Sequence, residues 1–172
     1  MFNHQVQEMF YRNAKAPEDL PWHRDEPGRS LKEAIDERRS PGTALDLGCG
    51  SGVVSVYMAK RRYQVTGIDL MPRTIEMAKE RAGRENARVE WVHADLLEWP
   101  PSRQFEPILD SGCLHSLIGG DRRRYRAQLL TWLAPDGDYI LGHSGREDSW
   151  TGAPWVRREG RAVRSSPSSR PS

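Results

Sequence analysis

The residues best suited to chemistry form a glycine-rich run with an acid in front of it. Asp46 precedes Gly48, Gly50 and Gly52, and the run lies between a short apolar stretch and a segment with helical character. A tight strand-to-helix turn requires unusual backbone angles, and residues without a Cβ let a ligand approach the main chain. No phosphate-binding lysine follows, and a carboxylate suits a cation better than a pyrophosphate. The run therefore predicts a site for a ligand that carries positive charge.

Two further acids stand at the ends of the next two expected strands. Asp69 comes about twenty residues after the glycine run, where an acid in a dinucleotide-type fold accepts hydrogen bonds from both ribose hydroxyls. Asp95 is placed to accept a hydrogen bond from an adenine amino group, with Met71 and Leu96 as apolar neighbours of the ring. The alternatives are that Asp95 caps a helix and that Met71 belongs to the core. Three carboxylates along one edge suit a nucleoside joined to a cationic amino acid, as in S-adenosylmethionine.

The elements that must position these acids alternate between strand and helix. The residue pattern predicts strands at 43–47, 64–68, 88–93, 105–110 and 138–142, and helices at 4–14, 31–38, 53–62, 72–83 and 121–133. Short connections between them favour a parallel sheet with helices on both faces and right-handed crossovers. The predicted fold class is therefore α/β: a Rossmann-like, doubly wound, mostly parallel sheet in three α/β/α layers.

Several of these segments resemble the motifs of class I S-adenosylmethionine-dependent methyltransferases. Residues 45–52, 65–69 and 93–95 are similar to the family's first, second and third motifs, and the resemblance extends over residues 42–142. Residues 135–138 are similar to the Pro-Gly-Gly turn before strand five, although aspartates replace part of it. The resemblance implies S-adenosylmethionine as cofactor and S-adenosylhomocysteine as its product.

The same resemblance assigns parts of the cofactor to individual residues. Asp46 and Gly48 are expected to meet the methionine moiety, Asp69 the ribose, and Asp95 and Leu96 the adenine. The full predicted cofactor-binding set is Trp22, Asp46, Gly48, Cys49, Gly50, Asp69, Leu70, Met71, Asp95, Leu96 and Asp110. Within it, the alternative for Cys49 is that it is only a small residue in a tight turn.

The region after the fourth expected strand resembles one subgroup of the family. Residues 110–117 and 121–125 are similar to small-molecule methyltransferases of the thiopurine, thiol and halide type. The Pro21-Trp22 pair resembles the N-terminal arm that folds over the cofactor in those enzymes, although His23 stands where they carry an acid. This resemblance places the methyl acceptor beside the end of strand four.

His115 is the predicted catalytic residue. Its side chain has the chemistry of a general base, and it lies in the segment expected beside the reactive methyl group. A phenol acceptor is helped by a base, whereas a thiolate or a halide needs none. The alternative is that His115 only hydrogen-bonds the backbone of its loop. His143, at the end of the fifth expected strand, is a second candidate for contact with the acceptor, and Cys113 either lines the pocket or is a buried thiol.

The chain divides into three expected regions. Residues 1–40 form a helical arm, residues 41–145 the Rossmann-like cofactor domain, and residues 146–172 an irregular, largely disordered tail rich in Ser, Pro and Arg. Full members of the family continue with further strands, whereas the composition after residue 142 supports no strand pair. We therefore expect the last strands to be lacking and the exposed sheet edge to favour a homodimer.

Composition excludes several classes of partner. The chain has 26 basic and 24 acidic residues, so no basic platform for nucleic acid is expected. The two cysteines, Cys49 and Cys113, lack a metal-ligand spacing, so no metal is expected and both thiols are predicted to be free in a reducing, cytoplasmic compartment. No apolar run is long enough for a membrane helix, and no membrane association is expected.

The sequence thus predicts a methyltransferase that moves a methyl group to a small-molecule acceptor such as a thiol, halide or phenol. One alternative is a module that binds S-adenosylmethionine with little or no turnover, because its C-terminal part is incomplete. A nicotinamide-dependent oxidoreductase is a further alternative, against which the absence of a GxGxxG spacing counts. A protein or nucleic-acid methyltransferase is disfavoured because no Asn-Pro-Pro-Tyr motif follows strand four.

Overall fold

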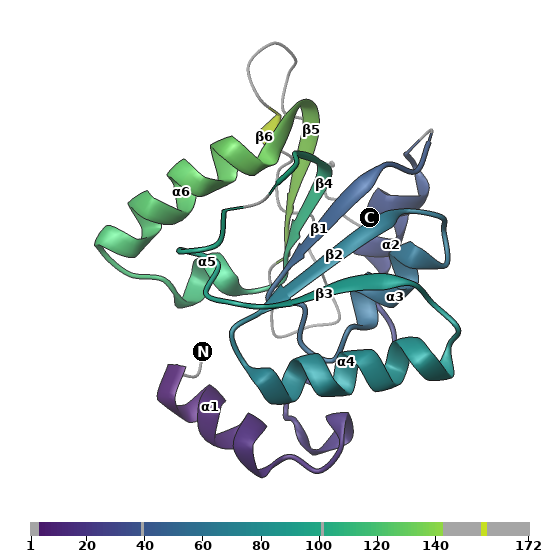
Figure 1. The fold of residues 1–172 in the computed structure, drawn as a ribbon, viewed down its shortest axis with the longest axis vertical. Helices are drawn as coiled ribbons and strands as arrows, with labels where there is room; N and C mark the ends of the chain where they lie inside the picture. Colours follow the sequence, from purple (N-terminus) through teal and green to yellow (C-terminus); the bar gives the residue numbers. More distant parts are fainter. Residues whose placement is uncertain (1–3, 39, 101, 143–155, 158–172) are drawn as a thin grey trace, which may run out of the picture.

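The fold is built on a six-stranded sheet with helices on both faces (Figure 1). The computed structural model describes residues 4–38, 40–100, 102–142 and 156–157. The strands are β1 (Thr43–Leu47), β2 (Gln64–Asp69), β3 (Val89–His93), β4 (Phe105–Asp110), β5 (Leu133–Leu141) and β6 (Val156–Arg157). The helices are α1 (His4–Asn13), the 3-10 turn η1 (Pro17–Asp19), α2 (Arg29–Asp36), α3 (Val53–Ala59), α4 (Pro72–Arg84), α5 (Cys113–Ser116) and α6 (Gly120–Trp132).

The strand order β3-β2-β1-β4-β5-β6 confirms the predicted doubly wound sheet. The first five strands are parallel, and β1 lies between β2 and β4. Register places Leu47 beside both Ile68 and Asp110, and Asp69 beside His93. Because parallel strands end at a common edge, the chain segments that follow β1 to β4 meet there. This carboxyl edge is where open α/β sheets bind ligands.

Alternating side chains of the strands divide the core between the two faces. On one face, Ala44 and Val65 pack with Leu31 and Ile35 of α2 and Met58 of α3. On the other face, β-strand residues pack with α6 and the segment after β3; the large members are Leu45, Leu47, Ile68, Phe105, Ile108, Tyr125, Trp132 and Tyr139. The sheet is thus the middle of three layers, as predicted.

Two glycines allow the helices of the first face to approach the sheet closely. A Cβ on Gly67 of β2 would lie 2.7 Å from the Trp91 ring, and one on Gly52, just before α3, would lie 2.8 Å from the same ring. Gly52 also has φ +79, which a residue with a side chain rarely adopts. Trp91 therefore fills the space that these two glycines leave, and this contact sets the start of α3 beside α4.

Two elements differ from the sequence prediction by more than two residues at one end. The helix predicted for residues 53–62 ends at Ala59, because the chain turns out of the helix and Arg62 adopts φ 70. Strand β5 begins at Leu133 rather than at residue 138, since Leu133 pairs with Phe105 of β4 across an irregular register. Gly137 permits this pairing, because a Cβ there would lie 2.8 Å from the Phe105 carbonyl oxygen.

The C-terminal region contains one short strand among the described residues. The composition after residue 142 supports no pair of strands, and the structure has the single strand β6, which pairs antiparallel with β5, with Val156 opposite Tyr139. Two residues are too short a run to leave a compositional signal. His143 and most of the predicted tail at residues 146–172 lie outside the described residues.

The predicted arm at residues 1–40 has two parts with different surroundings. Ala14 and Leu20 pack on Met77 of α4, together with the rings of Phe10, Tyr11 and Trp22. The second part, α2, lies in the core of the sheet face, and Arg38 just after it forms an ion pair with Asp138 of β5. Within the part of the chain that the structure describes, no helix is long and apolar enough to span a bilayer.

Candidate functional site

The connection between β1 and α3 forms the floor of the candidate site. Gly48, Gly50 and Gly52 adopt φ values of +64, +52 and +79, and the Cys49 amide donates to the Ile68 carbonyl at 3.0 Å. Among the described residues outside its chain neighbours, a Cβ on Gly50 would meet only the Tyr11 hydroxyl, at 3.9 Å, so the main chain at this glycine is open to a ligand. The predicted role of the glycines in exposing the backbone is therefore compatible with the geometry.

Asp46 lies beneath this turn and is 1% exposed. Its Oδ2 accepts a hydrogen bond from the Ser55 hydroxyl at 2.6 Å. Burial raises the pKa of Asp46 to about 7; the negative charges of Asp69 and Asp110 add to the increase, and the Ser55 hydrogen bond opposes it. A cationic ligand nearby would favour the ionised carboxylate.

Asp69, at the end of β2, ties the glycine turn to the start of α4. One carboxylate oxygen accepts a hydrogen bond from the Gly50 amide and the other from the Met71 amide, both at 2.9 Å. Burial raises the pKa of Asp69, although these two amides oppose the increase. Each carboxylate oxygen can accept more than one hydrogen bond, so Asp69 can hold the turn and still bind ligand hydroxyls. The adjacent Leu70 side chain is exposed.

The end of β3 supplies the third predicted carboxylate. Asp95 is exposed, and its Oδ1 accepts a hydrogen bond from the Leu97 amide at 2.8 Å, so it caps a turn rather than a helix. Leu96 is partly buried against the sheet. His93 Nε2 lies 3.0 Å from the Leu70 carbonyl oxygen, which links the ends of β3 and β2. The Ala94 amide donates to the Asp69 carbonyl at 3.1 Å, so the segment that carries Asp95 and Leu96 starts beside Asp69.

The end of β4 differs from the other three strand ends. Asp110 is fully buried, and its carboxylate accepts hydrogen bonds from backbone amides and from two tyrosine hydroxyls. The short helix α5, which the sequence did not predict, follows at once and carries Cys113 and His115. Cys113 reaches the glycine turn, since a Cβ on Gly48 would lie 2.5 Å from its Sγ. His115 is half-buried on the same helix.

The arm contributes a residue that sequence reasoning missed. The Trp22 indole donates a hydrogen bond to the Tyr11 hydroxyl at 3.1 Å, and this hydroxyl lies nearest to Gly50. Burial and the Asp69 charge raise the pKa of Tyr11, so its hydroxyl stays protonated. The Tyr11 hydroxyl therefore connects Trp22 to the glycine turn. The helical pattern at residues 4–14 was visible in the sequence, but no motif singled out Tyr11.

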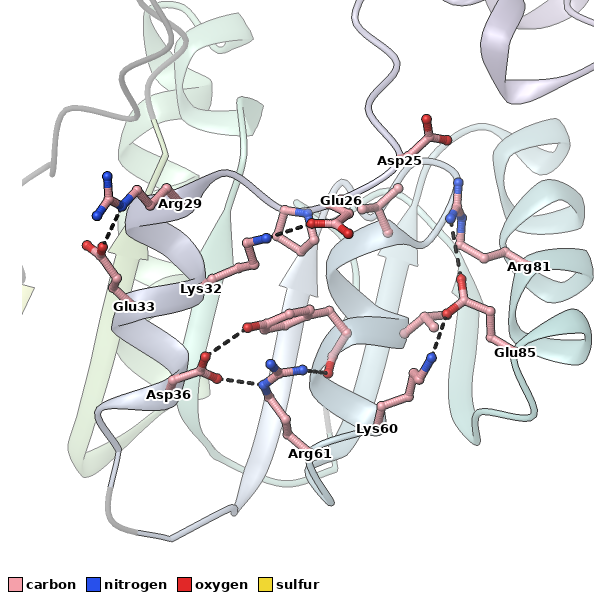
Figure 2. Close-up of a pocket in the computed structure, with 14 residues that line it drawn as sticks. Asp25, Glu26, Arg29, Lys32, Glu33, Asp36, Lys60, Arg61, Arg81 and Glu85 are labelled. Carbon is pink, nitrogen blue, oxygen red and sulfur yellow. Dashed lines mark hydrogen bonds and ion pairs between the residues drawn. The ribbon is translucent and has the colours of Figure 1, made fainter.

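A charged hollow of about 540 Å³ lies elsewhere, over α3 between α2 and α4 (Figure 2). Its acidic and basic residues are equal in number, and several are paired: Arg61 with Asp36, Lys60 with Glu85, and Lys32 with Glu26. No residue of the predicted cofactor set lines it. This balanced charge gives the hollow no preference for a cationic ligand, in contrast to the acid-rich carboxyl edge.

One group of side chains on the arm has donors suited to a metal. Ligand atoms of Glu18, His23 and Asp25 lie within 4.8 Å of one another. His23 Nε2 already contacts Asp25 Oδ1 at 3.1 Å, and the two carboxylates are exposed. None of the three belongs to the predicted cofactor set, although His23 directly follows Trp22. The prediction that the site uses no metal stays a prediction.

Comparison with known proteins tests the family that the sequence motifs resemble. A family model described as "Methyltransferase domain" matches residues 44–137, more than half of the chain. A solved structure from work on the conversion of a disulfide bond into a thioacetal group during echinomycin biosynthesis superposes with a TM-score of 0.71. It is 28% identical, and the match covers 83% of this chain and 61% of that one.

Two curated relatives extend the comparison. The 2-heptyl-1-hydroxyquinolin-4(1H)-one methyltransferase of Mycobacteroides abscessus is 30% identical over 145 residues, which cover 79% of this chain and 63% of that protein. The tRNA1(Val) (adenine(37)-N6)-methyltransferase of Vibrio cholerae is 37% identical over 75 residues, 41% of this chain and 31% of that protein. The chain spans less than two thirds of each of these three proteins. The chain belongs to the class I S-adenosylmethionine-dependent methyltransferase family.

Proposed function

We propose that this chain binds S-adenosylmethionine at the carboxyl edge of its sheet and transfers the methyl group to a small-molecule acceptor. The observation that carries the proposal is the arrangement of Asp46 and Asp69 at an open glycine turn, with Asp95 just after the neighbouring strand β3. The Gly50 amide donates a hydrogen bond to the Asp69 carboxylate, so the carboxylate and the ligand-accessible backbone belong to one surface. Family membership supports the same reading.

Each part of the cofactor has residues that fit it. The glycine turn and the negative charge of Asp46 suit the cationic methionine part, and Asp69 suits the two ribose hydroxyls. Asp95, with Leu70, Met71 and Leu96, suits the adenine, which needs one acceptor and apolar walls. Tyr11 and Trp22 would cover the turn from the arm. Cys49 contributes its backbone to the turn.

Methyl transfer needs the protein mainly to position the two reactants and to exclude water from them. When bound, S-adenosylmethionine would supply an electrophilic methyl group: the acceptor would bond to the methyl carbon while the carbon–sulfur bond breaks and S-adenosylhomocysteine leaves. The residues of this chain would hold the acceptor in line, exclude water and take up a proton where the acceptor carries one. We assign the role of proton acceptor to His115, whose imidazole lies on α5.

The acceptor we favour is a hydroxyl on a planar ring system. The Mycobacteroides relative is named for a hydroxyquinolone, and its match covers most of this chain. Thiols and halides remain within the predicted class. The tRNA-modifying relative matches a much shorter segment, and the near balance of 26 basic against 24 acidic residues provides no electrostatic platform for RNA. We expect a cytoplasmic protein, with a homodimer as a further prediction.

Two measurements test the function. Calorimetry with S-adenosylmethionine, S-adenosylhomocysteine and NAD tests the cofactor, and binding of NAD alone would contradict the proposal. Transfer of a radiolabelled methyl group to phenols, hydroxyquinolones, thiols, iodide and a tRNA transcript then tests the acceptor. Cofactor binding without transfer to any of them would favour the alternative of a binding module. His115→Ala should slow a phenol about a hundredfold and a thiol much less, and equal effects would exclude the base role.

A further inference from the structure

Asp110 is the most heavily hydrogen-bonded carboxylate at the candidate site. One oxygen accepts from the amides of Gly112 at 2.9 Å and Cys113 at 2.7 Å. The other accepts from the Leu114 amide at 3.0 Å and from two tyrosine hydroxyls. The side chain is fully buried. Five donors of the chain thus converge on this one carboxylate.

The two tyrosines come from different elements of the same face. Tyr125 of α6 donates to Asp110 Oδ2 at 2.5 Å, and Tyr139 of β5 donates to the same oxygen at 3.0 Å. Both rings are buried in the core. Burial and the Asp110 charge raise the pKa of both hydroxyls, so they remain protonated donors. Asp110 thus connects β4, β5 and α6 at one point.

Helix α5 and the turn before it need contacts with the rest of the protein to keep a defined position. Helix α5 has four residues, Cys113–Ser116, and a single turn of helix is unstable without tertiary contacts. The residue before it, Gly112, has φ +138, so the chain changes direction sharply there. The three amides that Asp110 binds belong to this turn and to the first residues of α5. Their hydrogen bonds therefore determine where Cys113 and His115 point.

We propose that Asp110, Tyr125 and Tyr139 form a buried clamp that positions α5 against the glycine turn, with Asp110 acting as a positioning residue rather than as a cofactor ligand. The role of the clamp in catalysis rests on the proposed function. Its structural role does not, because Cys113 and Gly48 lie in contact whatever the site binds. The two roles can be measured separately.

The structural role is tested by alkylation of the two free thiols with iodoacetamide, followed by peptide mass spectrometry. Cys113 is held by the clamp, whereas Cys49 lies on the glycine turn, so it serves as an internal control. Tyr125→Phe and Tyr139→Phe each remove one donor and should raise Cys113 labelling about tenfold through local opening, with Cys49 unchanged. Tyr63→Phe is the matched control, since its hydroxyl donates to the Ile35 carbonyl on the opposite face. Equal increases at both thiols, or none, would overturn the clamp.

The catalytic role is tested on the same variants. We expect S-adenosylhomocysteine affinity within about twofold of the unmodified chain, while kcat with the acceptor falls about tenfold at an unchanged acceptor KM. Parallel losses of cofactor affinity and turnover would show that Asp110 serves the cofactor instead. If the unmodified chain binds no cofactor, the proposed function fails, and the alkylation result still decides whether the clamp exists.

Discussion

The two halves of the carboxyl edge use their acids in opposite ways. In the half formed by β1, β2 and β3, Asp46, Asp69 and Asp95 make few hydrogen bonds for the number they can accept. In the half formed by β4 and β5, Asp110 makes five. All four aspartates lie at or near strand ends, so their positions in the sequence do not distinguish their roles.

The difference lies in what surrounds each carboxylate. Burial raises the pKa of Asp46 and Asp69, which marks carboxylates whose charge is poorly compensated by the protein. Asp110 is more completely buried than Asp69, yet it is surrounded by amide and hydroxyl donors. An under-compensated acid is available to a cationic or hydroxyl-bearing ligand, whereas a compensated one stabilises its own loop. The comparison therefore supports the proposal that one half binds the ligand, while Asp110 of the other half positions its own loop.

The largest expected effect is on stability and belongs to Asp110. Asp110→Ala would remove the shared acceptor of two buried tyrosine hydroxyls and three part-buried amides, and it should lower the free energy of unfolding by about 3 kcal/mol or more. Urea unfolding measures it. Asp95→Ala is the control, since that side chain is exposed, and it should change the same quantity by less than about 0.5 kcal/mol. Similar values for the two variants would remove the contrast between the halves.

The next effect is on affinity and belongs to Asp69. Asp69→Ala should weaken S-adenosylhomocysteine binding at least tenfold, because hydrogen bonds to a charged acceptor contribute roughly 1.5–3 kcal/mol. Calorimetry measures the dissociation constant. Asp69→Asn keeps one acceptor oxygen for the Gly50 or Met71 amide and should show an intermediate loss. An affinity that stays unchanged in both variants would take Asp69 out of the site.

A smaller effect on affinity is expected at the contact between Gly48 and Cys113, where the two halves of the carboxyl edge meet. Gly48→Ala places a Cβ 2.5 Å from Cys113 Sγ at φ +64, and a left-handed conformation costs a residue with a side chain about 1–2 kcal/mol. We expect S-adenosylhomocysteine affinity to fall about fivefold. Adding Cys113→Ala removes the close contact and should restore part of the loss, while the backbone strain remains.

The control for this pair is Gly83→Ala in α4, where a Cβ would meet no described residue outside the adjoining backbone of its own helix within 4 Å. It should leave affinity unchanged and stabilise the helix slightly. A double variant no better than Gly48→Ala alone would show that Cys113 does not limit the space at the turn.

The sequence predicted the fold because its signals are local. The glycine turn, the acids at residues 46, 69 and 95, and the alternation of strand and helix each follow from short stretches of chain, and the observed strand order agrees with them. The features that it missed are contacts between distant residues. Tyr11 meets Gly50 only after the arm folds back, and Tyr139 meets Asp110 across 29 positions of the chain.

Asp110 shows why residue type alone could not assign its role. Its place after strand four is what the family resemblance uses, and the prediction that it binds the cofactor is not tested by the comparisons. The donors that satisfy it come from α6 and β5 and include backbone amides, which no side-chain pattern reveals. Helix α5 was missed for the same reason, since it depends on this carboxylate rather than on its own helical propensity.

The smallest expected effect is a pH dependence that comes from Asp46. Its folded-state pKa is about 7, above the value of about 3.9 in an unfolded chain. Between these two values the folded form keeps a proton that the unfolded form has lost, so this group makes the protein less stable as pH rises from about 4 to about 7. Exposed acids such as Asp36, whose pKa is lowered by the Arg61 guanidinium, contribute in the opposite direction.

Asp46→Asn isolates the contribution of Asp46, because the exposed acids are common to both proteins. Urea unfolding at several pH values should show a flatter loss of stability towards pH 7 in the variant. A cationic ligand that lowers the Asp46 pKa by half a unit would bind about threefold more tightly above pH 7 than below it. This pH dependence of S-adenosylhomocysteine affinity should vanish in Asp46→Asn. If the pH dependence persists in Asp46→Asn, the carboxylate that interacts with the positive charge of the ligand must be Asp69, at the end of β2, rather than Asp46.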